Sequence, residues 1–153
     1  MADLKVGVRK GIIVTSGLGS CVGVTLYDEQ RKVGGMAHVM LPEIPKNGKK
    51  GNPAKYADTA LEKLLKEMKN MRARVKRLEA KIAGGAQMFD FSDTSDKMRI
   101  GARNIKAVKR ELKERSIPLR GEEVGEDYGR TMELHLDTGK VVIKTVKFEN
   151  IIL

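Results

Sequence analysis

Alternating apolar and polar positions predict β-strands toward both ends of the chain. Near the start, runs rich in valine and isoleucine are separated by glycine-rich or polar turns, as in short strands joined by tight connections. These strands are expected at residues 11–15, 21–27 and 33–40, with turns at 16–20 and 28–32. Toward the end, residues 130–136 and 140–147 alternate with the two-residue period of half-buried strands, and Asp137-Thr138-Gly139 between them favours a hairpin.

The middle of the chain has the apolar spacing of amphipathic helices. A first helix is expected to begin at Pro53, with Asn52 as its N-cap. Its buried face is predicted to consist of Ala57, Leu61, Leu64, Leu65, Met68 and Met71. A second helix is expected at about 101–115, with Pro118 marking its end. Its inward positions are predicted to be Ile105, Val108 and Leu112.

Residues 76–83, between the two helices, alternate like a further half-buried strand. Polar loops are expected at 42–53, a stretch rich in proline, glycine and lysine, and at 91–97. With strands at both ends and two helices between them, the pattern predicts an α+β fold rather than a regular strand–helix alternation.

Size and composition place the chain among ordinary globular proteins. Its 153 residues are expected to form a single domain, residues 1–153, and apolar residues make up 41% of the chain. No stretch approaches the roughly 20 apolar residues of a membrane span, and the start does not resemble a signal peptide. A single cysteine without an export signal indicates the reducing cytoplasm.

The net charge of +10 is unevenly distributed. Residues 54–81 carry a net charge of +5 and residues 97–120 carry +7, whereas residues 121–153 carry −3. The helical segments are therefore basic, which suits an acidic partner, although a solvated lysine-rich surface gives the same pattern. Nucleic acid is a weaker interpretation, because the chain has only six aromatic residues and no aromatic or zinc-finger motif of a nucleic-acid-binding module.

The chemistry-bearing residues of the sequence are Cys21, at the end of VTSGLGSC, and His38, 17 residues later. A lone thiol has no internal disulfide partner, and it attacks carbonyl carbon only as a thiolate. An adjacent imidazole can take its proton and later deliver that proton to a leaving amine. Thr15 is the candidate third group, which would orient the imidazole through its hydroxyl or its main-chain carbonyl. The alternative is a small buried cysteine and a structural histidine.

The glycine-rich run before Cys21 has several interpretations. It lacks the third glycine of a dinucleotide fingerprint and the lysine of a P-loop, which argues against a phosphate cradle. Backbone N–H groups at Gly19 and Ser20 could instead stabilise an oxyanion beside the sulfur. A metal site is weakly supported, since His135 is expected on the polar face of a strand as an ordinary surface histidine.

Five segments together resemble the chemoreceptor glutamine deamidases, the CheD family of bacterial and archaeal chemotaxis. They are VTSGLGSC at 14–21, GGMAHVMLP at 34–42, YADTAL at 56–61, KIAGGAQMF at 81–89 and IGARN at 100–104. The resemblance spans nearly the whole chain. It implies that Cys21 is the nucleophile, that His38 is the catalytic histidine and that Thr15 is the orienting residue.

The resemblance further implies a layered mixed β-sandwich flanked by helices, similar to cysteine-dependent toxin deamidases. The implied reaction converts glutamine side chains of methyl-accepting chemotaxis receptors to glutamate, with release of ammonia and without a metal or organic cofactor. The phosphatase CheC is the implied protein partner. A rival hypothesis is a non-catalytic basic adaptor that binds CheC or receptors through its lysine-rich helices.

Overall fold

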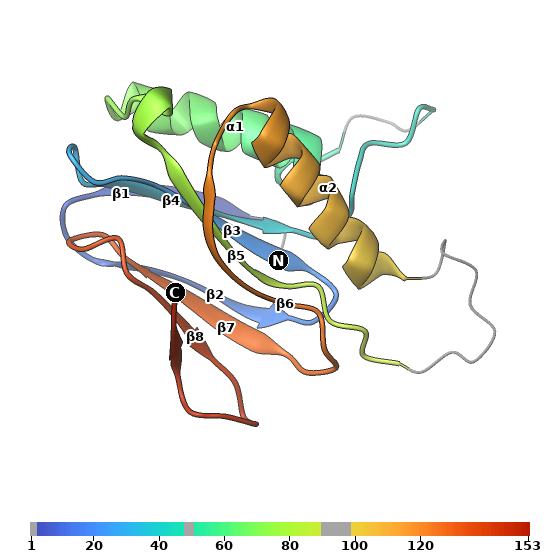
Figure 1. Ribbon diagram of the computed structural model, residues 1–153. Coiled ribbons are helices and arrows are strands. Elements are labelled where there is room, and N and C mark those ends of the chain that lie inside the picture. The colour runs from blue at the N-terminus through green and yellow to red at the C-terminus, as the bar shows by residue number, and fades with distance from the viewer. Residues whose placement is uncertain (1–2, 48–50, 90–98) are drawn as a thin grey trace.

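Two helices and two β-sheets form three stacked layers in the computed structural model of this chain, which describes residues 3–47, 51–89 and 99–153. In Figure 1, helices α1 and α2 lie over one face of a five-stranded sheet, and the four-stranded sheet lies against its other face. This arrangement confirms the predicted α+β layered sandwich.

The five-stranded sheet is the central layer, with strand order β1-β4-β3-β5-β6. Its strands are β1 (Leu4–Val8), β3 (Val22–Asp28), β4 (Val33–Val39), β5 (Glu79–Gly84) and β6 (Leu119–Val124). Neighbouring strands are antiparallel except β5 and β6, which run parallel and are connected through α2. A parallel pair needs such a crossover because a tight turn cannot return the chain to the same end of the sheet.

The four-stranded antiparallel sheet has the order β2-β7-β8-β9. Its strands are β2 (Ile12–Leu18), β7 (Arg130–His135), β8 (Val141–Lys144) and β9 (Ile151–Ile152). The pairing of β7 with β8 confirms the hairpin predicted around Asp137-Thr138-Gly139. The register of β2 against β7 shifts between Thr15 and Leu18, so the strand is irregular just before the glycine-rich turn.

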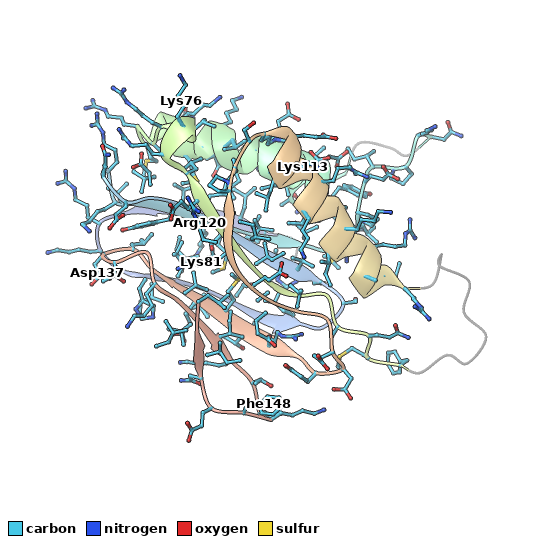
Figure 2. All side chains as sticks on the ribbon, in the orientation of Figure 1. Lys76, Lys81, Lys113, Arg120, Asp137 and Phe148 are labelled. Carbon is cyan, nitrogen blue, oxygen red and sulfur yellow. The ribbon has the colours of Figure 1, made fainter. Side chains whose placement is uncertain are left out.

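Both helices cover the outer face of the five-stranded sheet. They are α1 (Ala57–Asn70) and α2 (Ile100–Glu114), and two short 3-10 turns lie at Pro53–Lys55 and Val75–Arg77. Among the described residues, neither helix combines the length and the apolar run that a membrane span requires. The helix layer is rich in cationic side chains, and Figure 2 shows Lys76 and Lys113 on its outer side.

The molecule has one apolar core on each face of the central sheet. The core under the helices joins Val24 and Leu26 of β3 to Leu64 of α1 and Val108 of α2. The core between the sheets joins Met36 of β4 to residues of the second sheet, including Leu18, Met132, Leu134 and Ile143. Each fully buried aliphatic side chain contributes about 2 kcal/mol of transfer free energy.

Two adjacent glycines allow β4 to lie between these cores. A Cβ atom at Gly35 would come within 2.7 Å of the Leu64 side chain on α1, and one at Gly34 within 2.7 Å of Leu136. Both distances are shorter than side chains tolerate, so the two glycines let a helix and a second sheet approach opposite faces of the same strand. His38 follows on this closely packed strand.

Several element predictions were wrong in detail. Strand β2 continues to Leu18 through most of the predicted 16–20 turn. Asn52 caps only the short 3-10 turn through its side chain, and α1 begins at Ala57. The strand expected at 76–83 starts at Glu79, because Val75–Arg77 forms a 3-10 turn, and β8 ends at Lys144 rather than at 147.

Strands β1, β6 and β9 were not predicted. Two of them, β1 and β6, are the edge strands of the central sheet, and β9 is an edge of the second sheet. Edge strands are partly solvated, so polar residues and glycines interrupt their apolar pattern. The loop expected at 91–97 lies outside the described residues, as do positions 48–50 of the loop expected at 42–53.

Candidate active site

A hydrogen bond between the two sheets joins Thr15 to His38. The Thr15 hydroxyl oxygen lies 2.8 Å from Nδ1 of the imidazole. Thr15 lies on β2 of the four-stranded sheet, and His38 lies on β4 of the central sheet. The two side chains therefore meet in the space between the sheets, where only 3% of His38 is exposed.

The position of Cys21 follows from the pairing of β3 with β4. Gly23 pairs with His38 in this ladder, and side chains two residues apart along a strand point to the same face. Cys21 directly precedes β3, two residues before Gly23, and its side chain is half-buried against the core between the sheets. The thiol and the imidazole thus share one face of the central sheet as diagonal neighbours.

The imidazole nitrogen that Thr15 does not contact is unpaired. Nε2 of His38 is buried and makes no hydrogen bond to any described residue, including Cys21. A buried ring nitrogen normally has a partner, because leaving one unpaired costs about 1–3 kcal/mol. The structure therefore brings Thr15 and His38 into direct contact and leaves Nε2 available for a proton from a third group.

Burial shifts the pKa values of the Cys21 thiol and the His38 imidazole. It raises the pKa of the Cys21 thiol above its ordinary value of 9.0. It lowers the pKa of His38 below its ordinary value of 6.5. Both shifts have the same cause, since a charged group loses hydration when it is buried. Near neutral pH the free protein therefore holds a neutral thiol and a neutral imidazole rather than an ion pair.

The turn before Cys21 is fixed by a glycine-rich segment that follows β5. The Gly85 N–H donates to the Cys21 carbonyl and the Ala86 N–H donates to the Gly19 carbonyl, both at 2.8 Å. A Cβ atom at Gly84 would lie 2.2 Å from the Cys21 carbonyl oxygen. These contacts give GGA at 84–86 a structural role that the sequence analysis missed, although the KIAGGAQMF segment was its signal.

Gly19 and Ser20, the two residues suggested as sources of oxyanion donors, make different hydrogen bonds in the structure. The N–H of Gly19 donates to the Gly17 carbonyl at 3.0 Å, so it is engaged within the turn. The Ser20 carbonyl accepts a hydrogen bond from the Asn104 side chain at 2.9 Å. Sequence reasoning also missed Asn104, which lies in the IGARN segment used only for the resemblance.

Two small cavities open beside these residues. One, of about 290 Å³, lies between the edges of β1 and β2 and is lined by Thr15, His38 and residues of both strands. The other, of about 210 Å³, is lined by Ser20, Met88, Phe89 and the start of α2. Met88 and Phe89 are largely exposed there, so apolar surface lies next to the turn that precedes Cys21.

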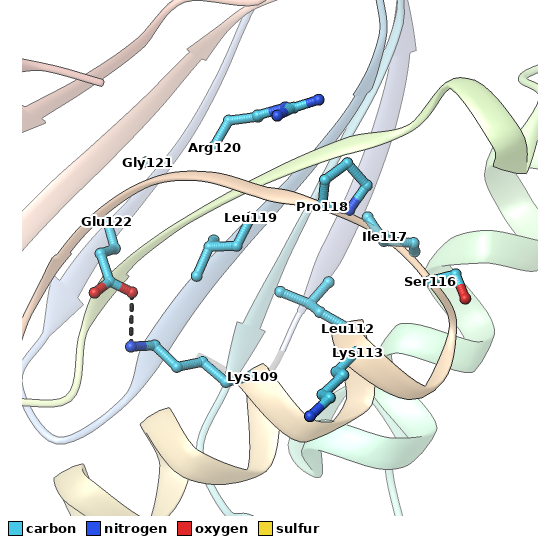
Figure 3. Close-up of a pocket in the computed structure, with 10 residues that line it drawn as sticks. All are labelled: Lys109, Leu112, Lys113, Ser116, Ile117, Pro118, Leu119, Arg120, Gly121 and Glu122. Carbon is cyan, nitrogen blue, oxygen red and sulfur yellow. Dashed lines mark ion pairs between the residues drawn. The ribbon is translucent and has the colours of Figure 1, made fainter.

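A larger cavity, of about 880 Å³, lies between the end of α2 and β6 (Figure 3). An ion pair between Lys109 and Glu122 crosses it, and none of the candidate site residues lines it. His135 lies on β7, where its Nε2 is 3.6 Å from the Glu133 carboxylate, and it lines neither of the two small cavities. Among residues 3–47, 51–89 and 99–153, no three His, Cys, Asp or Glu side chains form a group suited to a metal ion.

Fold and site together define an α+β sandwich protein with a thiol, an imidazole and a hydroxyl between its two sheets. Comparison with known proteins identifies the family: the CheD profile, described as CheD chemotactic sensory transduction, matches residues 40–145. The chain belongs to the CheD family.

Curated relatives extend the similarity to almost the whole chain. The chain is 52% identical over 147 residues to the chemoreceptor glutamine deamidase CheD of Halalkalibacterium halodurans. The matched region covers 95% of this chain and 91% of that relative. It is also 52% identical over 146 residues to the probable chemoreceptor glutamine deamidase CheD of Clostridium botulinum strain Hall. This match covers 95% of this chain and 90% of that protein.

Proposed function

We propose that this protein hydrolyses glutamine side-chain amides of methyl-accepting chemotaxis receptors to glutamate, releasing ammonia, during chemotactic adaptation. Family membership and the printed names of the relatives support this activity. The observation that carries it is the part-buried Thr15–His38 hydrogen bond, which leaves Nε2 unpaired on the sheet face shared with Cys21. The proposed enzyme is a protein-glutamine glutaminase with a Cys-His-Thr triad.

Thr15 has the role of orienting the imidazole of His38. When Nδ1 carries the proton, it donates to the Thr15 hydroxyl oxygen, and Nε2 keeps a lone pair. That tautomer is the one in which Nε2 can accept the thiol proton. The lowered pKa of His38 keeps the imidazole neutral near pH 7, so that Nε2 has a lone pair for the proton.

The reaction then proceeds in two halves. The Cys21 proton moves to Nε2 of His38 as the sulfur attacks the amide carbon, and the carbonyl oxygen becomes an oxyanion. The C–N bond breaks as His38 returns the proton to the leaving nitrogen, which departs as ammonia and leaves a thioester. A water molecule, deprotonated by His38, attacks the thioester carbon, and the thiol and a glutamate side chain are regenerated.

The Gly19–Cys21 turn is the proposed source of oxyanion donors. Since the Gly19 N–H is bonded to the Gly17 carbonyl, the N–H groups of Ser20 and Cys21 are the better donors in this turn. A Cβ atom at Gly19 would lie 3.4 Å from the Met88 side chain, an ordinary contact distance, so Met88 borders this turn.

The charge of the helix layer supports an acidic protein partner. The segments that contain α1 and α2 carry most of the net charge of +10, and cationic side chains project from this layer in Figure 2. We assign this surface to contact with the receptor, and we include CheC as a regulatory partner and the cytoplasm as the location. Salt should weaken such a contact, since exposed charges are screened over about 10 Å at 0.1 M ionic strength.

Mass spectrometry of a purified receptor cytoplasmic fragment tests the proposal. Incubation with the protein should convert specific glutamines to glutamates and release one ammonia for each conversion. Cys21→Ala should abolish both signals while preserving the far-ultraviolet circular dichroism spectrum, and His135→Ala serves as an active control. Full conversion by Cys21→Ala would refute the nucleophile assignment.

The alternative is a non-catalytic adaptor that binds receptors or CheC through the basic helix layer. The net charge favours this possibility, because binding through charge needs no thiol. An adaptor would bind the receptor fragment equally well with Cys21 or alanine at position 21, and neither protein would release ammonia. Release of ammonia that depends on Cys21 separates the two functions.

A further inference from the structure

Asn104 on α2 connects the helix layer to the backbone at both halves of the candidate site. It is completely buried, and its Nδ2 donates to the carbonyl oxygens of Ser20 and Met40, each at 2.9 Å. Only the amide nitrogen can serve two carbonyl acceptors, which fixes the orientation of the side chain. Ser20 directly precedes Cys21, and Met40 lies two residues after His38.

Asn104 acts where the β3–β4 ladder ends. The last pair of this ladder joins Val22 to Val39, so the next residues outward, Cys21 and Met40, lie beyond the regular pairing. The Asn104 amide bridges the two chains at this point, through the carbonyl of Ser20 on one side and that of Met40 on the other. It therefore holds the segment carrying the thiol at a fixed distance from the strand carrying the imidazole.

The bond to Ser20 also orients the peptide that precedes the thiol. The Ser20 carbonyl and the Cys21 N–H belong to one planar peptide, in which they point in opposite directions. Since Asn104 on α2 holds the carbonyl, the Cys21 N–H is directed away from the helix layer. The site between the sheets lies on that opposite side of the central sheet.

The remaining oxygen of Asn104 argues against a role in apolar packing alone. Oδ1 is buried and has no hydrogen-bond partner among the described residues. An apolar side chain of similar size would avoid this penalty, but it would leave the carbonyls of Ser20 and Met40 without the donor they have here. Asparagine is therefore a poor choice for packing, and its two donated bonds provide the reason for its presence.

We propose that Asn104 is a positioning residue that directs the Cys21 N–H toward the oxyanion of the deamidation reaction. This inference rests on the proposed function. Asn104 does not touch the substrate. It acts through the Ser20 carbonyl, and through Met40 it keeps this donor in register with the strand of His38.

The test uses three variants of the full chain. Asn104→Leu removes both donated bonds while keeping a side chain of similar length, and Asn104→Asp keeps the shape but replaces the donor with a carboxylate. Val108→Ala is the matched control, because Val108 is a fully buried residue of α2 in the apolar core, so truncating it perturbs the helix through packing alone. Steady-state kinetics with the receptor fragment give kcat and KM for each variant, and thermal unfolding gives Tm.

We expect kcat to fall on the order of a hundredfold in Asn104→Leu and Asn104→Asp, the loss typical for one oxyanion donor, with little change in KM. Asn104→Leu should also lower Tm, because the Ser20 and Met40 carbonyls lose their donor, so its kcat is compared at a temperature where it is folded. Val108→Ala should lower Tm and leave kcat near wild type at a temperature where it is folded. A wild-type kcat in folded Asn104→Leu, or an equal loss of kcat in Val108→Ala, would overturn the proposal.

Hydrogen exchange provides a readout that does not depend on activity. The amides of Gly85 and Ala86 donate to the carbonyls of Cys21 and Gly19, so their protection reports on the order of the turn. Their exchange should accelerate at least about tenfold in Asn104→Leu but not in Val108→Ala. Unchanged protection would contradict the positioning role even if kcat fell. If the wild-type protein releases no ammonia, the proposed function fails, and the exchange measurement alone decides whether Asn104 orders the turn.

Discussion

The Thr15 hydroxyl on β2 lies 2.8 Å from Nδ1 of His38 on β4, so this side-chain hydrogen bond links the two sheets of the sandwich at the candidate site. This bond identifies the hydroxyl of Thr15, rather than its main-chain carbonyl, as the group that contacts the imidazole. It also makes the site dependent on how the two sheets pack. The residues of this site come from two layers with separate hydrogen-bonding ladders.

Replacing Thr15 with valine should reduce kcat on the order of tenfold to a hundredfold, because the ring loses the hydrogen-bond partner that orients it. Thr15→Ser retains the hydroxyl and should remain close to wild type. Ammonia release from the receptor fragment measures both variants, and circular dichroism checks their folding. Equal activities of the valine and serine variants would contradict the role of the hydroxyl.

The two histidines should differ sharply in their importance. His38→Ala removes the proposed base and should lower kcat by about two to four orders of magnitude. His135→Ala alters a half-buried position beside Glu133, and its activity should stay near wild type. The same ammonia assay compares them, and comparable losses in both variants would mean that the base is misassigned.

The pH dependence of kcat/KM should reflect the lowered pKa of His38. Neutral His38 is required to accept the thiol proton, and burial places its pKa below 6.5. Activity should therefore stay high as the pH falls to 6.5 and decline only below that value. An acid limb with its midpoint above pH 6.5 would contradict this expectation.

Alkylation of Cys21 by iodoacetamide tests the raised pKa of the thiol. Burial raises the pKa of the thiol above 9.0, so the free protein should react slowly at neutral pH and faster as the pH rises past 9.0. Fast, pH-independent labelling between about pH 6 and pH 8 would indicate a preformed thiolate instead.

Asp28, at the end of β3, should be a major determinant of stability. Its buried carboxylate accepts bonds from the Arg77 guanidinium and from the N–H of Arg74. Burial alone would raise its pKa, but these bonds outweigh burial and hold the pKa below its ordinary value of 3.8. Asp28→Asn should lower the free energy of unfolding by about 3 kcal/mol at pH 7, measured by urea denaturation.

The stability difference between wild type and Asp28→Asn should depend on pH. A carboxylate whose pKa is lowered by folding stabilises the protein fully above its ordinary pKa, and this contribution disappears as the pH falls through the lowered value. The difference between wild type and Asp28→Asn should therefore shrink below pH 3.8. Asp137→Asn, an exposed change in the hairpin turn, is the control and should have little effect at either pH.

Two glycines near Cys21 should respond differently to alanine. Gly17 has a φ of +70° with no atom within 4 Å of an added Cβ, so Gly17→Ala costs only backbone strain, about 1–2 kcal/mol. Gly84 has a φ of +110°, and its Cβ would also collide with the Cys21 carbonyl. Gly84→Ala should lower Tm more than Gly17→Ala and reduce deamidation. The opposite order of Tm values would show that the turn adapts to the added atom.

The local pattern of the sequence was sufficient for the main elements of the fold. Three-to-four-residue apolar spacing located α1 and α2, and two-residue alternation located the β7–β8 hairpin, because these periods depend only on which face of an element is buried. The pattern did not predict strands β1 and β6, because edge strands face solvent and carry both apolar and polar side chains. Sequence also singled out Thr15, Cys21 and His38, through residue types and the resemblance to a family.

Only the tertiary structure decided how those residues meet. Thr15 and His38 belong to different sheets, so their contact depends on packing between layers, which no local periodicity encodes. The same holds for Asn104, whose helical position explains neither its complete burial nor its bonds to Ser20 and Met40. The charge states of Cys21 and His38 were likewise set by burial, because desolvation arises only when distant segments exclude water from the same space.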